Sequence, residues 1–145
     1  MQSLREQLIQ AVMACLTPVA TAQGATLRRQ PTVPTDRVHS PALLVYLEAE
    51  TVRRVNERCE RELTLRLVAV SFGTETEAPE PIADRLLTAA HLALFADVTL
   101  GGLALGLKEL DCDWQQDDAD MEAAAIPARY QITYRTLVND ISQKG

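Results

Sequence analysis

Two stretches in which apolar and polar residues alternate constrain the fold of this chain most strongly. In residues 62–70 one face carries Leu63, Leu65, Leu67 and Ala69, and the other carries Glu62, Thr64, Arg66 and Val68. Near the end of the sequence, Tyr130, Ile132 and Tyr134 alternate with Arg129, Gln131, Thr133 and Arg135. A period of two is typical of a β-strand with one buried face. Both stretches are therefore predicted to be strands, with an outer face that is either wet or shared with a partner.

Three further stretches are predicted to form strands. Residues 42–48 contain a continuous apolar run after a proline, which favours a buried strand over a helix. Leu103, Leu105 and Leu107 keep one parity, but the apolar positions then shift to Leu110, Cys112 and Trp114. A β-bulge near Lys108 and Glu109 would restore the pattern. Residues 25–30 could form only a short strand, and the charged residues 49–61 are either an exposed hairpin tip or a short solvated helix.

Two helices are predicted from apolar residues that recur every three or four positions. The first carries Leu4, Leu8, Ala11, Val12 and Cys15, starts with a capping box of Ser3 and Glu6, and is expected to end near Thr17 and Pro18. The second begins after residues 78–81 and faces the core with Ile82, Leu86, Ala89 and Ala93, widened by Leu87, Ala90 and Leu94. Its polar strip is Asp84, Thr88 and His91.

The order of these elements predicts the fold class. It is an α+β domain with an antiparallel or mixed sheet of about four to five strands and two helices packed on one face. A chain of 145 residues fits one domain spanning residues 1–145. Four prolines and one glycine interrupt residues 17–41, which are therefore expected to form a long arm.

Charge is distributed unevenly along the chain. The net charge is -6, with 9 basic and 7 acidic residues in 1–72 and 5 basic and 13 acidic residues in 73–145. The first half thus carries +2 and the second -8, so general binding to nucleic acid has no global support. A bipolar chain can attract its own copies, although solvated charge without a partner explains the same pattern.

Residue types that carry chemistry form no recognisable site. His39 and His91 belong to no triad motif, and no histidine lies near Cys15, Cys59 or Cys112 at the spacing of a zinc site. The acidic cluster after Trp114 lacks the spacing of an EF-hand loop, and Gly101 and Gly102 are typical of a turn. We expect no enzyme activity and no cofactor. We also expect no membrane span or secretory signal, and hence a cytoplasmic protein.

Taken together, several stretches resemble the tail terminator proteins of long-tailed bacteriophages, the group that includes the minor tail protein U type. They are residues 40–46 (Ser-Pro-Ala-Leu-Leu-Val-Tyr), 61–65 (Arg-Glu-Leu-Thr-Leu), 99–104 (Thr-Leu-Gly-Gly-Leu-Ala) and 130–136 (Tyr-Gln-Ile-Thr-Tyr-Arg-Thr). Their order and spacing, rather than any single stretch, carry the resemblance, which covers nearly the whole chain.

The resemblance implies a structural virion protein. Such a subunit forms a ring, expected to be a hexamer, that caps the tail tube, ends its polymerisation and joins the head connector, while DNA passes through the lumen. It would be made in the host cytoplasm and reside in the virion, at the head-proximal end of the tail. A head-completion or neck connector protein is the nearest alternative, and a small ligand-binding regulatory domain is a more remote one.

Interface candidates follow from the charged sheet face and the basic segment 49–61. They are Arg53, Arg54, Arg58, Arg66, Asp111, Asp113, Arg129 and Arg135. Internal cross-strand pairing on a solvated face is an equally good explanation of these charges. An acidic lumen would repel DNA phosphates, which makes Asp117, Asp118 and Asp120 candidates for the lining of the ring.

Overall fold

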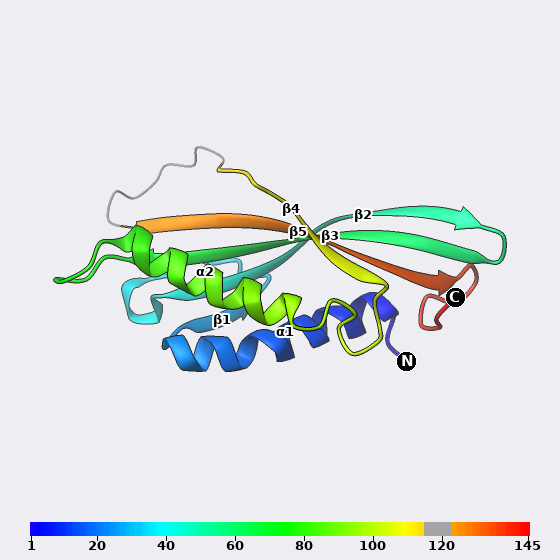
Figure 1. Ribbon diagram of the computed structural model, residues 1–145, viewed down its shortest axis with the longest axis horizontal. Helices are drawn as coiled ribbons and strands as arrows, with labels where there is room; N and C mark the ends of the chain where they lie inside the picture. The colour runs from blue at the N-terminus through cyan, green and yellow to red at the C-terminus, as the bar shows by residue number, and fades with distance from the viewer. Residues whose placement is uncertain (115–122) are drawn as a thin grey trace.

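A five-stranded mixed sheet with two helices on one face forms the fold, as the sequence predicts (Figure 1). The computed structural model describes residues 1–114 and 123–145. The strand order is β1-β2-β3-β5-β4, in which β1 runs parallel to β2 and the other pairs are antiparallel. The elements are α1 (Leu4–Gln23), β1 (Thr26–Arg29), the 3-10 turn η1 (Arg37–His39), β2 (Ala42–Val55), β3 (Arg58–Phe72), α2 (Pro79–Phe95), β4 (Gly106–Cys112) and β5 (Ala123–Leu137).

The core lies between the helices and the sheet. The strand residues that the alternation assigns to the inner face are buried there, namely Leu63, Leu65, Leu67, Tyr130, Ile132 and Tyr134. A smaller apolar cluster of Ala42, Leu44 and Val68, with Tyr46 and Val70 at its border, forms on the other side of the sheet. The predicted inward and outward faces of both alternating stretches are thus confirmed.

The first helix differs from its prediction at both ends. The Ser3 hydroxyl accepts a hydrogen bond from the Glu6 N–H at 3.1 Å, as in a capping box, but the Glu6 carboxylate bonds to Arg29 at 2.7 Å instead of turning back. The expected end near Pro18 is wrong, because α1 continues to Gln23 with Pro18 inside it. Leu16 and Ala20 are buried on the last turns, and Gly24 ends the helix in the left-handed conformation with φ 64°.

The second helix is rotated relative to the predicted apolar stripe. It begins at Pro79, and its buried residues are Ala83, Leu86, Ala90 and Leu94, whereas the expected core residues Ile82, Ala89 and Ala93 are only partly buried. Because of this rotation, His91, which was predicted on the polar strip, is partly buried against β5. The Tyr130 hydroxyl, 2.9 Å from His91 Nδ1, is the hydrogen-bond partner that the sequence could not locate.

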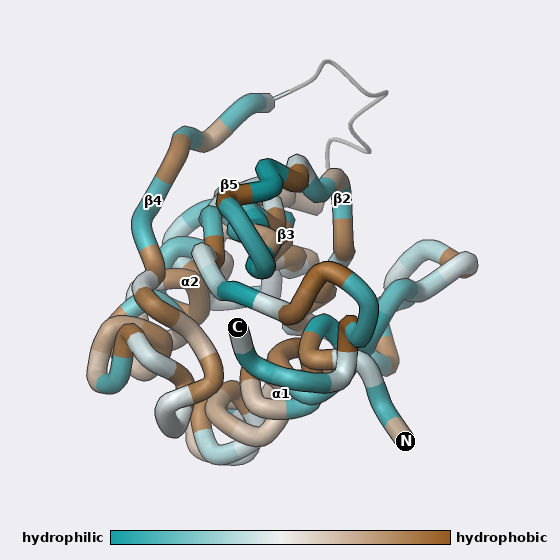
Figure 2. Tube along the Cα trace, turned by 90° about the vertical axis from the view of Figure 1, so that its right-hand side faces the viewer, coloured by the Kyte–Doolittle hydropathy of each residue, from teal (hydrophilic) through white to brown (hydrophobic). Residues whose placement is uncertain are grey.

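The arm is shorter than expected. Because α1 and β1 take up its first part, the irregular stretch that we call the arm from here on comprises residues 30–41, which link β1 to β2 and contain η1. β1 lies at one edge of the sheet, opposite β4 at the other edge. Viewed along the long axis, β2 and β4 lie on opposite flanks of the molecule, with α2 on the β4 flank (Figure 2).

Residues 49–61 form the end of a long hairpin of β2 and β3, so the hairpin alternative is confirmed and the short helix is wrong. The strands meet at a two-residue turn of Asn56 and Glu57, where Asn56 has a φ of 59°, and the hairpin extends past the helices (Figure 1). β1 pairs only with residues 42–45 of β2, so the outer edge of β2 beyond its register shift at Leu47 and Ala49 has no partner strand among the described residues.

β4 contains the predicted bulge. Its register against β5 shifts between Glu109 and Asp111, one residue from the expected position. The prediction that the strand begins near Leu103 is wrong, since Leu103 lies in the turn that follows α2 and the strand starts at Gly106. In that turn Gly101 and Gly102 have φ values of 75° and 85°, which glycine adopts without strain. Neither helix of the described residues combines the length and the apolarity that a bilayer crossing needs.

Candidate functional site: charged sheet face and flanking surfaces

The sheet face that points away from the helices carries two groups of charged side chains that are paired across the strands. On β5, Arg129 donates to Glu48 of β2 at 3.2 Å and to Asp111 of β4 at 2.9 Å, so it joins strands on both of its sides. Nearer the hairpin tip, Glu60 accepts from Arg53 at 3.4 Å and from Arg135 at 3.5 Å. Most of these charges are therefore paired with one another across the strands.

One aromatic contact completes this outer face. The guanidinium of Arg66 lies over the Tyr46 ring, 4.8 Å from its centre. Nearby, the side-chain amide of Gln131 donates to Glu62 at 3.2 Å. The face thus has the internal cross-strand pairing that the sequence left open as an alternative to an interface. Pairing fixes the side chains in position, and a rigid patterned face can still meet a partner.

The structure brings six of the eight interface candidates together on this face, namely Arg53, Arg58, Arg66, Asp111, Arg129 and Arg135. Arg54 belongs to the opposite parity and donates to the carbonyl of Asn56 at 3.0 Å, so it stabilises the hairpin turn. Asp113 is exposed just beyond β4. The proposed lumen residues Asp117, Asp118 and Asp120 lie outside the described residues.

A buried charge cluster on the helix-facing side was missed by the sequence analysis. Glu50 accepts hydrogen bonds from Arg5 at 2.6 Å, from Arg61 at 3.3 Å and from the hydroxyl of Tyr134. The side chains of Glu50 and Arg61 are 11% and 10% exposed. Arg61 also donates to Thr136 at 3.1 Å. The parity of β3 could have revealed it, because Arg61 continues the inward-facing positions of Leu63 and Leu65.

Opposing effects set the ionisation of this cluster. Burial raises the pKa of Glu50, but the hydrogen bonds from Arg5 and Tyr134 and the positive charges of Arg5 and Arg61 outweigh it, so the pKa is lowered overall. Burial, together with the bond to Glu50, raises the pKa of the Tyr134 hydroxyl. The carboxylate stays charged and ties the start of α1 to the far part of the sheet.

An apolar groove lies between α2 and β4. It is a hollow of about 220 Å³ whose lining includes Leu87, His91, Leu92, Glu109, Cys112 and Tyr130. His91 Nδ1 lies 2.9 Å from the Tyr130 hydroxyl, and its ring stacks on Phe95 with 4.6 Å between ring centres. Burial raises the pKa of Tyr130 to about 12. We call this hollow the α2–β4 groove.

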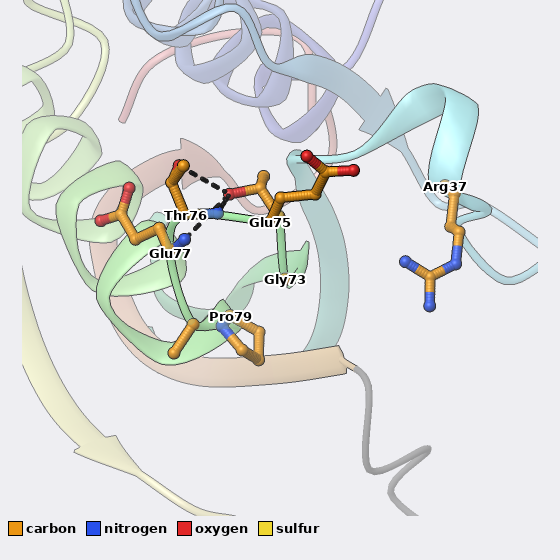
Figure 3. A pocket seen from close by; sticks show the side chains of 8 residues that line it. Arg37, Gly73, Glu75, Thr76, Glu77 and Pro79 are labelled. Carbon is orange, nitrogen blue, oxygen red and sulfur yellow. Dashed lines mark hydrogen bonds between the residues drawn. The ribbon is translucent and has the colours of Figure 1, made fainter.

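The loop between β3 and α2 forms a second, open hollow opposite η1. Figure 3 shows Arg37 on one side and Gly73, Glu75, Thr76, Glu77 and Pro79 on the other. The Thr74 hydroxyl accepts from the N–H groups of Thr76 at 3.3 Å and Glu77 at 3.1 Å, and the Glu77 carboxylate bonds to Arg85. These polar groups hydrogen-bond to one another, and in this way they stabilise the turn and the start of α2.

Cysteine and metal chemistry find little support in the described parts of the chain. Among residues 1–114 and 123–145 no group of three or more histidine, cysteine or acidic side chains is arranged to hold a metal ion. Cys15, Cys59 and Cys112 are free thiols, buried or partly buried. Burial raises the pKa of Cys15 and Cys112, so both thiols remain protonated at neutral pH.

Comparison with known proteins bears on the fold. No family model matches the chain, and no curated protein matches its sequence. Among solved structures, a chain from the virion of the native gene transfer agent (GTA) particle superposes with a TM-score of 0.51 and 14% sequence identity. The superposition covers 84% of this chain and 90% of that one. This chain therefore shares its fold with a component of a virion.

Proposed function

We propose that this protein is a structural subunit of a phage-like particle, namely a tail terminator. Several copies, most simply six, would form a ring on the head-proximal end of the tail tube, stop its growth and receive the head connector. The observation that carries the proposal is the fold that the chain shares, over 84% of its length, with a component of the gene transfer agent virion.

The stretches that resemble tail terminators support the same proposal, because they converge in the structure. Residues 40–46 lead into β2, residues 61–65 lie in β3 and residues 130–136 lie in β5, and these three strands are neighbours at the centre of the sheet. Residues 99–104 form the turn that leads from α2 to β4. The resemblance therefore follows the structural centre of the domain and not scattered surface positions.

The two sheet edges favour a ring over a two-fold dimer. One edge is the short parallel strand β1 next to the arm, and the other is β4 next to α2. Because the edges differ in length, direction and neighbours, a contact that joins one to the other is heterologous, and it closes into a ring when the rotation between neighbouring copies divides a full turn. In this assembly the partners are further copies, the tube protein and the connector, and DNA only passes through.

The test is co-assembly with a tail tube protein from the same phage-like particle. Tubes polymerised alone should vary in length, and tubes polymerised with this protein should end in a ring visible by negative-stain electron microscopy. Rings that bind the head connector but leave the tube ends bare would instead identify a neck connector protein. A monomer or dimer that associates with neither component would refute the proposal.

A further inference from the structure

We propose that the arm of one copy, residues 30–41, docks in the α2–β4 groove of the next copy, and that this contact repeats around the ring. The inference rests on the proposed function, since it names the surfaces through which that ring closes. Four features of the molecule support it: exposed apolar side chains on the arm, an apolar groove of matching character, their location on opposite flanks, and the charges of those flanks.

The arm presents apolar side chains on a fixed support. Val33 and Val38 are 62% and 86% exposed, although valine is usually buried. Asp36 accepts from the His39 N–H at 3.0 Å and so caps η1, while Arg37 stacks over the Phe72 ring at 4.8 Å. An arm that is ordered before contact loses less conformational entropy on binding. Val38 is thus displayed on a turn that is already held in place.

The α2–β4 groove offers an apolar receptor. Leu87 and Leu92 come from α2 and Cys112 from β4, while Tyr130 forms the base with its hydroxyl already engaged by His91. Leu92 is 68% exposed, and Trp114, just beyond β4, is 61% exposed. A bound branched side chain would cover carbon rather than leave a polar group without a partner. The groove therefore selects for an aliphatic residue such as Val38.

Arm and groove lie on opposite flanks that carry opposite charge. The strands β1, β2 and β3 come from residues 1–72, which sum to +2. The elements α2, β4 and β5 come from residues 73–145, whose described part, 73–114 and 123–145, holds 5 basic and 9 acidic residues and sums to -4. The strand order keeps the two groups apart, with β1 and the arm at one edge and β4 at the other. The uneven charge along the sequence becomes an uneven charge across the molecule, and unlike flanks of neighbouring copies attract.

The structure supplies a native reporter for this contact, because Cys112 lines the groove. The variant Val38→Cys should form a disulfide with Cys112 of the adjacent copy when the protein is oxidised at mildly alkaline pH on tail tubes. Non-reducing gels should then show a ladder of covalent oligomers. Val52→Cys is the matched control, because Val52 is also an exposed valine, at 52%, but lies on the hairpin. Cys112→Ser combined with Val38→Cys should abolish the ladder.

A second variant tests the same surface without thiols. Leu92→Asp places a charge at the groove, and because the side chain is mostly exposed, the urea midpoint should stay unchanged. Loss of the apolar contact should weaken self-association about tenfold or more, measured by mass photometry.

Two failures are distinguishable. If rings form on tubes while Val38→Cys gives no more cross-linking than Val52→Cys and Leu92→Asp assembles normally, the arm contact is wrong and the tail terminator proposal stands. If the wild-type protein neither forms rings nor caps tubes, the proposed function fails and this contact fails with it.

Discussion

Replacement of Glu50 by glutamine should destabilise the fold strongly, since the carboxylate is the centre of the buried charge cluster. The substitution keeps the size of the side chain but removes the charge that balances Arg61, which is 10% exposed. Removing one partner of a buried ion pair costs about 3 to 5 kcal/mol. Arg5 is 37% exposed and can turn to water, so the lower end of that range applies, about 3 kcal/mol.

Glu48 on the same strand provides the control. It pairs with Arg129 on the outer face and is 39% exposed, so Glu48→Gln should cost less than about 1 kcal/mol. The free energy of unfolding from urea titrations at pH 7, with tryptophan fluorescence and far-UV circular dichroism followed together, measures both variants. If the two substitutions cost the same, the cluster does not stabilise the fold as its geometry implies, and the reasoning is wrong.

The same cluster should make stability depend on pH. The pKa of Glu50 is lowered by folding from its ordinary value of 4.5, so the carboxylate binds a proton more readily in the unfolded chain. Its stabilising contribution is therefore complete above about pH 4.5 and is lost as the pH falls through the lower folded value. Glu50→Gln lacks this group, so the stability difference between wild type and variant should shrink as the pH is lowered from 6 to 3.

Three further substitutions separate the contributions of core, cap and surface. Leu65→Ala, at a fully buried strand position, should cost about 2 to 5 kcal/mol in urea unfolding. Gly24→Ala should cost about 1 kcal/mol because the position has a φ of 64°, whereas Gly106→Ala, with open space around it and no positive φ, should cost less. Arg129→Ala should change stability by less than about 1 kcal/mol, and the change should vanish in 1 M salt; a large, salt-independent loss would contradict the view that these outer pairs are solvated.

The sequence predicted the strands of the sheet well because their signal is local. The alternation around Leu65 and around Ile132 reports directly which side chains face the core, and neither position depends on a distant residue. The outer charges Arg66 and Arg129 follow from the same parity. That part of the candidate surface could therefore be assigned without a structure.

Features that depend on contacts between residues far apart in the sequence could not be predicted from local patterns. The helix that should stop at Pro18 continues because Leu16 and Ala20, on either side of the proline, are both buried in the core, and this burial outweighs the local signal. Glu50 turns inward only because the register of β2 shifts between Leu47 and Ala49, a detail that depends on pairing with β3. His91 is partly buried because Tyr130 lies opposite it. Each case requires knowledge of a neighbour far away in the sequence.

The unpaired edge of β2 bears on how separate copies of the protein meet in solution. Residues 49–55 display a row of backbone donors and acceptors that have no partner strand in the described parts of the chain, and such a row can template fibre-like stacking of identical chains. Arg53 and Arg54 occupy this stretch, and like charges repel when two copies approach edge to edge. The two arginines therefore oppose edge-to-edge pairing of separate copies.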